Sequence, residues 1–130
     1  MKRLTVFLFS ILLSIAFCLS FVACDKEAQP VVITVSNEAK EGMTLVEYME
    51  DMQKNGEISF TVQGGMMTEI NGVKNGTNSY WMLYTSDADN ADTSWGTYEY
   101  NNQTLGSAVL GAESLVVAVG AIYIWVYQTF

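Results

Sequence analysis

The stretches Ile70-Asn71-Gly72-Val73 and Tyr80-Trp81-Met82-Leu83-Tyr84 decide the fold of this chain. An Asn-Gly pair between two apolar runs is a strong signal for a tight hairpin turn. The second stretch predicts a central strand, whose even-numbered and odd-numbered side chains point to opposite faces of a sheet. Another aromatic run, Tyr123-Ile124-Trp125-Val126-Tyr127, predicts a closing strand near the C-terminus.

Further strands are predicted on both sides of these two. Apolar alternation and β-branched residues indicate strands at residues 31–35, 58–62, 66–70, 98–100, 103–105 and 115–119, and they extend the closing strand over 121–127. Asn101-Asn102 is expected to form a hairpin turn, whereas residues 86–96 are acidic and polar and are expected to form a loop. Strands therefore dominate the chain.

One helix is expected between the first two strands. Thr44 is a suitable N-cap, and Glu47 three residues later completes a capping box, in which each side chain serves the other residue's backbone N–H. Apolar side chains at helical spacing give it one face, made by Leu45, Tyr48, Met49 and Met52. The predicted fold class is α+β, with antiparallel β-sheets and one packed helix in a single domain over residues 31–130.

Residues 1–23 have the pattern of a secretory leader, with two basic residues before a long apolar run. The stretch Phe21-Val22-Ala23-Cys24 resembles a bacterial lipobox, although Leu is usual at its first position. The resemblance implies a lipid on the Cys24 thiol, a tether over residues 24–30 and a place outside the cytoplasm on the bacterial cell membrane. The alternatives are a leader that releases a free protein, and a membrane-spanning helix, against which the Cys24 context speaks.

The chain after residue 23 is strongly acidic. All fourteen of its Asp and Glu residues lie there, against four lysines, for a side-chain charge of −10. Phosphate backbones repel such a domain, so nucleic acid is excluded as a partner and high solubility is expected. Anionic lipid repels it as well, which leaves the lipid on Cys24 as the predicted attachment to the membrane.

The residue types exclude most catalytic devices. The sequence has no histidine, and its two cysteines, Cys18 and Cys24, go to the leader and to the lipid. Nucleophile–base pairs built on imidazole or thiol are therefore excluded. The carboxylates fall on the outer face of the helix or in loops. We expect no enzymatic activity and no catalytic cofactor.

The segment from Asp87 to Asp92 resembles a calcium-binding loop only in part. Acids stand at the first and third positions of an EF-hand pattern, but Ala91 occupies the fifth and no Gly follows it. The twelfth position, which should carry Glu, is Tyr98. The residues favour a solvated loop over a metal site.

Three tryptophans and seven tyrosines are many for a domain of this size. Trp81 and Trp125 lie within predicted strands and are expected in the core. Trp95 stands in a polar segment beside Gly96, where an exposed ring suits contact with a flat, amphipathic ligand such as a macrocycle or a sugar. A ligand contact and a purely structural role for Trp95 are left as equal alternatives.

The order of these motifs resembles the transcobalamin-like C-terminal domain, a family found in bacterial surface proteins and as the smaller domain of vertebrate cobalamin carriers. The motifs are Val31-Val32-Ile33-Thr34-Val35, Gly42-Met43-Thr44-Leu45, Gly64-Gly65, Glu69-Ile70-Asn71-Gly72-Val73 and the two aromatic runs quoted above. The resemblance covers residues 31–130 and implies a β-grasp-like fold. In the vertebrate carriers this domain covers one face of cobalamin, while a helical barrel, which these residues do not contain, holds the other.

Two uses follow from the resemblance. The first is capture of a corrinoid, such as cobalamin, or a similar ligand for delivery to a transporter. Without the barrel, such a half-site would bind a corrinoid weakly, need a partner protein to complete it, or bind something else. The predicted ligand face consists of Trp95, Tyr98, Tyr80, Tyr84, Asn78 and Asn90. The second is a non-catalytic surface module that binds a protein or glycan partner, with those rings buried or paired across the interface.

Overall fold

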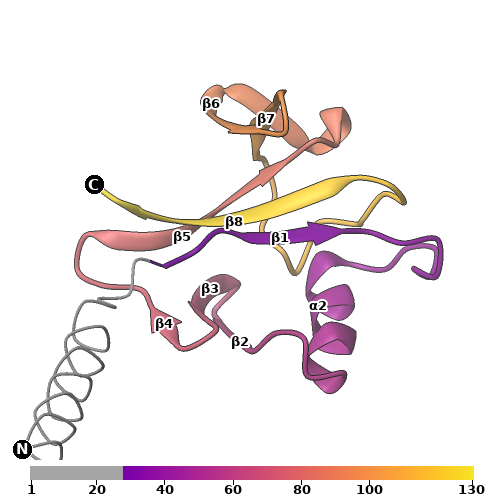
Figure 1. The fold of residues 1–130 in the computed structure, drawn as a ribbon, viewed down its shortest axis with the longest axis horizontal. Helices are drawn as coiled ribbons and strands as arrows, with labels where there is room; N and C mark the ends of the chain where they lie inside the picture. Colours follow the sequence, from indigo (N-terminus) through magenta and orange to yellow (C-terminus); the bar gives the residue numbers. More distant parts are fainter. Residues whose placement is uncertain (1–27) are drawn as a thin grey trace, which may run out of the picture.

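The computed structural model describes residues 28–130 (Figure 1). The predicted leader, Cys24 and most of the predicted tether lie outside the described residues. The elements in chain order are β1 (Val31–Thr34), α2 (Leu45–Lys54), β2 (Phe60–Gln63), β3 (Met66–Ile70), β4 (Val73–Lys74), β5 (Ser79–Thr85), the 3₁₀-helix η1 (Ala88–Asn90), β6 (Ala91–Tyr100), β7 (Gln103–Ala108) and β8 (Ile122–Thr129).

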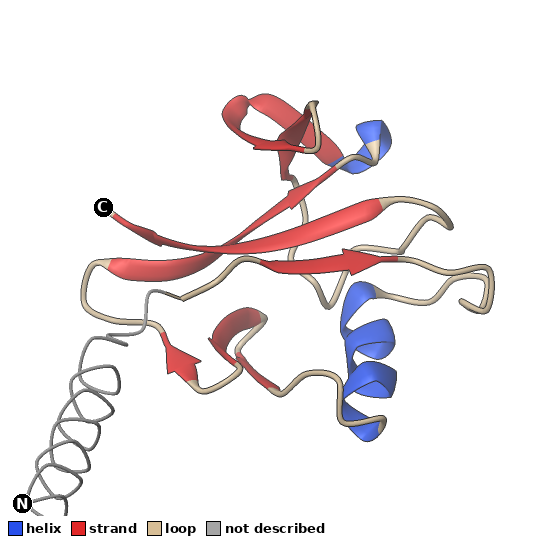
Figure 2. Ribbon diagram, in the orientation of Figure 1, coloured by secondary structure: helices blue, strands red, loops and turns tan. Residues whose placement is uncertain are grey.

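The strands form two antiparallel sheets. The larger has five strands in the order β1-β8-β5-β7-β6, and the smaller has three in the order β2-β3-β4. The helix and the small sheet lie on one side of the large sheet, and the β6–β7 hairpin projects on the other (Figures 1 and 2). The predicted α+β class is therefore confirmed, whereas the finer β-grasp description stays a prediction.

The main core lies between the large sheet and the elements on its helix side. Odd-numbered residues of β5 and β8, among them Leu83 and Tyr123, point into this core. They meet Leu45 and Met49 of α2, which are both fully buried, and Ile70 at the end of β3. The predicted alternation of side chains along the central strand is confirmed, because its even-numbered residues Met82 and Tyr84 belong to a separate cluster on the other side.

Both predicted hairpin turns are present. Asn71 and Gly72 have φ values of 50° and 83°, and Asn101 and Asn102 have values of 47° and 61°. A two-residue hairpin turn of this type needs a positive φ at both central positions, which Asn and Gly accept more readily than other residues. The Asn side chains thus mark where the chain reverses.

The predicted cap fixes the start of α2. The Thr44 hydroxyl accepts a hydrogen bond from the Glu47 backbone N–H at 3.3 Å, and the Glu47 carboxylate accepts one from the Thr44 N–H at 3.1 Å. The Leu45 N–H donates to the carbonyl of Leu115 at 2.8 Å, so one more free N–H of the first turn finds an acceptor. These bonds attach the helix start to the C-terminal part of the chain.

Two predicted segments are wrong. Residues 86–96 are not a loop, because η1 and the first half of β6 occupy them, and β6 pairs with β7 as early as Ala91. Residues 115–119 are not a strand. Val116 makes a single bridge to Thr44, and the Val117 N–H donates to the Met43 carbonyl at 2.9 Å. This β-branched run therefore crosses the helix start and has no strand to pair with along its length.

Candidate functional site

The side of the large sheet that faces away from α2 is only partly covered. Its side chains come from three neighbouring strands, β1, β8 and β5. We call this surface the open face, defined by Val32, Tyr80, Met82, Tyr84, Ile122, Ile124, Val126 and Gln128.

Strand register places these side chains in rows. Tyr84, Ile124 and Val32 lie opposite one another across three strands. Met82 pairs with Val126 in the next row, and Tyr80 pairs with Gln128 in the one after. Four residues along β5 separate Tyr80 from Tyr84, a distance of about 13 Å at the rise of a β-strand. The open face is thus long enough for a ring system and carries no charged side chain.

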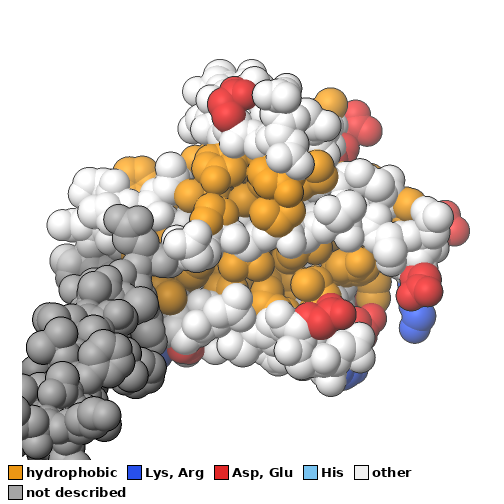
Figure 3. All heavy atoms as spheres, viewed as in Figure 1, with side chains coloured by type: hydrophobic (Ala, Val, Ile, Leu, Met, Phe, Trp, Pro, Cys, Tyr) orange, Lys and Arg blue, Asp and Glu red, His pale blue; other side chains and the backbone are white. Residues whose placement is uncertain are grey.

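Most of the open face reaches solvent. Tyr84 and Ile124 are buried, but Val32 is 38% exposed and Tyr80 is 37% exposed. The other members are half-buried. Figure 3 shows apolar surface between the β6–β7 hairpin and the strands below it. Exposed apolar patches of this kind on a soluble domain are often interaction sites.

The β6–β7 hairpin makes a wall at one end of the open face. β7 pairs with β5 only at Tyr84 and Thr85 before it leaves the sheet. Leu105 of β7 is buried against Tyr84 and Ile124, and the Tyr98 ring lies 5.7 Å from the Tyr84 ring. The wall is therefore fixed to the sheet by packing, and its aromatic side chains continue the open face.

An irregularity in β6 presents Trp95. The pairing with β7 shifts register between Asp92 and Thr97. Within this bulge the Asp92 carboxylate accepts bonds from the Ser94 hydroxyl and from the Ser94 N–H at 2.9 Å, and these two bonds lower the pKa of Asp92. Gly96 follows with a φ of 146°. Trp95 ends up 65% exposed, so the bulge holds a large ring in solvent.

The structure brings some of the predicted ligand residues together and separates others. Tyr84 and Tyr98 are in contact, and a Cβ at Gly96 would lie 3.7 Å from the Tyr84 ring, so the Trp95 bulge passes over it. Tyr80 lies at the far end of the open face, where its ring is 6.2 Å from that of Phe130.

Each of the two predicted Asn residues makes a hydrogen bond within the fold. The Asn78 backbone carbonyl accepts a bond from the Phe130 N–H at 2.8 Å, at the margin beyond Tyr80. The Asn90 side chain donates to the Asp87 carboxylate at 2.8 Å, so it serves η1. The sequence prediction also missed Gln128, whose carbonyl oxygen accepts a 2.7 Å bond from the Tyr84 hydroxyl. The alternation of residues 122–128 could have revealed it.

In the acidic segment before Trp95, the carboxylates of Asp87 and Asp92 accept local hydrogen bonds. Asp87 accepts bonds from the Asp89 N–H at 3.1 Å and from the Asn90 amide, which caps η1. Within residues 28–130 no cluster of three or more His, Cys, Asp or Glu side chains is arranged to hold a metal ion.

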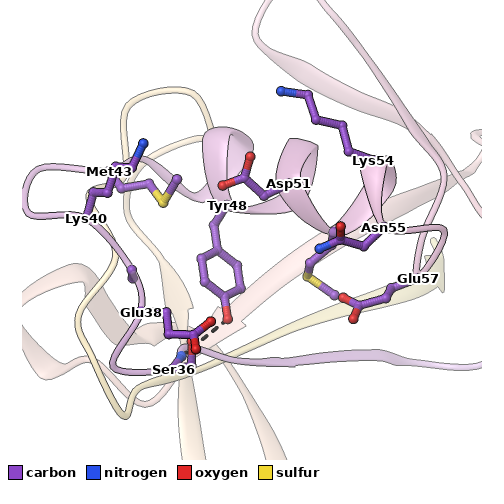
Figure 4. A pocket seen from close by; sticks show the side chains of 11 residues that line it. Ser36, Glu38, Lys40, Met43, Tyr48, Asp51, Lys54, Asn55 and Glu57 are labelled. Atoms are coloured by element: carbon purple, nitrogen blue, oxygen red, sulfur yellow. Dashed lines mark hydrogen bonds between the residues drawn. The ribbon is translucent and has the colours of Figure 1, made fainter.

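A hollow of about 400 Å³ with a polar lining lies beside α2 (Figure 4). Five charged side chains line it, namely Glu38, Lys40, Asp51, Lys54 and Glu57. The Tyr48 hydroxyl at its base accepts a bond from the Ser36 N–H at 3.2 Å and donates to the Thr34 carbonyl at 3.4 Å. This hydroxyl connects α2 to β1 through its two hydrogen bonds, and the charged side chains that line the hollow are all exposed.

No helix in the described part of the chain has the length and apolar character that a membrane crossing requires. The chain matches no family model, no curated protein and no solved structure. The likeness to transcobalamin-like C-terminal domains therefore rests on the sequence motifs quoted above.

Proposed function

We propose that the protein is a non-catalytic binding protein, held on the outside of the bacterial cell membrane by a lipid on Cys24, whose open face captures a flat, amphipathic ligand. A corrinoid such as cobalamin is the candidate that the sequence resemblance suggests. The observation that carries the proposal is an uncharged apolar sheet face with an aromatic wall and an exposed tryptophan at its edge.

The chemistry of the open face suits a ligand with an apolar face and a polar rim. Met82 and Val126 offer an apolar floor, and the Tyr80 ring and the Trp95 ring offer edges that combine apolar area with one polar atom. Gln128 supplies an amide beside the Tyr84 hydroxyl. Ligand sites commonly combine such an apolar lining with a few polar groups that fix orientation.

The alternative use, a module for a protein or glycan partner, is favoured by one observation. β1 pairs with β8 on one side only, so its outer edge is free of strand pairing within the described residues. Val32 on this strand is exposed on the open face. A partner strand added to β1 would extend the open face, in the manner of β-strand addition.

The test is a calorimetric titration of the full chain with cobalamin and with cobinamide. We expect saturable binding, and we expect Trp95→Ala to weaken it by roughly tenfold, because a large aromatic ring that covers the ligand contributes strongly to affinity. Val116→Ala is the matched control, because Val116 is 47% exposed and lies away from the open face.

Two results would count against the proposal. A flat titration with both compounds overturns the corrinoid proposal and leaves partner capture to be tested with β1 edge variants such as Val32→Lys. If Trp95→Ala binds the ligand with wild-type affinity, Trp95 and its bulge do not contact the ligand, even where binding itself is observed.

A further inference from the structure

The helix side of the sheet contains an apolar groove of about 280 Å³. It lies between the β2–β3 hairpin and the segment that follows β7, with β5 and β8 beneath it. We call it the Trp125 groove, and its main lining residues are Met66, Trp81, Leu83, Ala108, Leu110 and Trp125. Met82 is the one residue that lines this groove and also belongs to the open face.

The Trp125 indole is the unusual group in this groove. Trp125 is 4% exposed, and its Nε1 is the one buried side-chain polar atom within residues 28–130 that has no hydrogen-bond partner. Its neighbour Trp81 is equally buried, but the Trp81 Nε1 donates to the Val73 carbonyl at 2.8 Å. A buried N–H without an acceptor costs about 1–3 kcal/mol, so folded proteins rarely contain one.

The position of Trp125 in the sheet prevents its indole from moving out to solvent, where water could accept the N–H. It is in the middle of β8, paired with Leu83 of β5 on one side and Val31 of β1 on the other. Backbone pairing on both sides fixes the Cα and the direction of the side chain. Trp125 lines the groove, but its Nε1 has no contact with solvent, so a guest reaches the N–H only when the flexible lining side chains give way.

The lining sets the chemistry of what fits. No Asp, Glu, Lys or Arg side chain lines the groove, so an ion would lose its hydration without compensation. Met66 and Leu110 stand at the surface, 57% and 43% exposed. Methionine side chains are flexible and adapt to different shapes, which suits a rim that opens for a small guest.

We infer that the Trp125 groove binds a compact, uncharged, apolar molecule that carries one hydrogen-bond acceptor, and that this acceptor takes the Trp125 Nε1–H. The volume is just below the range of about 300–1,000 Å³ that is usual for drug-sized ligands, so the guest is small. The water-poor surroundings make a single N–H···O bond decisive for which guest is preferred. This site lies on the helix side of the sheet and shares Met82 alone with the open face, and it does not depend on the proposed function.

The probe is camphor, a rigid apolar ketone, with the hydrocarbon bornane and with camphorsulfonate as matched compounds. The indole N–H signals of the three tryptophans in the full chain are followed by NMR. We expect camphor to move the Trp125 indole proton downfield in a saturable manner and to leave those of Trp81 and Trp95 in place. Bornane should bind more weakly without that downfield shift, and camphorsulfonate should not bind.

Two variants test the roles of the N–H and of the space. Trp125→Phe keeps an apolar ring but removes the N–H, so camphor should lose roughly fivefold to tenfold in affinity and match bornane, as expected for one hydrogen bond. Ala108→Leu fills the groove and should abolish binding of both compounds while the Trp125 signal remains to report on the fold.

Several outcomes would overturn this inference. These are a Trp125 signal that does not move at saturating camphor, an unchanged camphor affinity in Trp125→Phe, and binding that survives Ala108→Leu. A shift of Trp95 in place of Trp125 would put the probe on the open face and also overturn it. A corrinoid should instead perturb Trp95, so the failure of either proposal can be told from the failure of the other.

Discussion

The two sides of the five-stranded sheet are covered to different extents, although the same strands supply the side chains of both. On the helix side, α2, the small sheet and the segment around Leu115 cover the strands, and Leu45, Leu115 and Tyr123 are completely buried. On the open face the β6–β7 hairpin covers one end only, and Tyr80 and Val32 reach solvent.

The difference separates stability from binding. Alternate residues of β5 and β8 point to opposite sides, so a substitution changes one side without removing a side chain from the other. The helix side holds the larger cluster of buried residues and should carry most of the free energy of folding. The open face can then keep apolar side chains exposed for a ligand, because the fold does not depend on covering them.

The largest expected effect tests this division directly. Leu45→Ala removes a fully buried side chain from the helix side and should lower the free energy of unfolding by about 2–5 kcal/mol. Val126→Ala on the open face removes a half-buried one and should cost roughly 1 kcal/mol. Urea denaturation measures both, and equal losses would contradict the division.

The next effect compares two tryptophans that lie on the same side. Trp81→Phe takes the indole donor away from the Val73 carbonyl and should cost about 1–3 kcal/mol. Trp125→Phe removes an N–H that has no partner, so it should cost clearly less although it loses a similar amount of buried ring. Thermal unfolding of the two variants decides this, and a Trp125→Phe loss as large as that of Trp81→Phe would show that the indole is not an unsatisfied group.

Much of the fold could be predicted from local patterns. The capping box at Thr44, the turn at Asn71 and the alternation along β5 each act over a few residues, and the structure shows all three. Residues 115–119 have the composition of a strand, but the start of α2 occupies the place of a partner strand. Sequence composition indicates which segments favour strand pairing, but it does not show whether a partner strand lies beside them.

The candidate site was harder to predict for the same reason. The aromatic content pointed to Trp95 and Tyr98, and Trp95 is exposed as a ligand contact requires. The open face, however, depends on which side of the sheet α2 covers, and that is set by the whole packing. The Asn90 amide donates to the Asp87 carboxylate three positions away, a local bond that the sequence composition does not reveal.

A smaller effect concerns pH on the helix side. Burial raises the pKa of Tyr123 above its ordinary value of 10.0, and the nearby Asp87 adds to the rise, while the hydrogen bond from the Ala118 N–H opposes it. Because the folded pKa is the higher one, stability is complete below about pH 10 and is lost as the pH rises through the folded pKa.

The Tyr123→Phe variant isolates this term. At neutral pH it should cost about 1 kcal/mol, for the lost acceptor of the Ala118 N–H. Above pH 10 its stability should fall less steeply than that of the wild type, in urea denaturation repeated across the alkaline range. Parallel curves for the two proteins would mean that other groups cause the alkaline loss.

The smallest expected effect is at Trp95, and it sharpens the contrast between folding and binding. Trp95→Ala removes a ring that is 65% exposed, so the free energy of unfolding should change by no more than about 0.5 kcal/mol in either direction. Gly96→Ala, in the same bulge, should cost more, because its φ of 146° strains any residue with a side chain. A large loss of stability in Trp95→Ala would place the ring in the structure of the hairpin. If Gly96 is needed for folding and Trp95 is not, the bulge has the shape that the fold requires and carries a ring that the fold does not require. That combination is expected where the ring contacts a ligand.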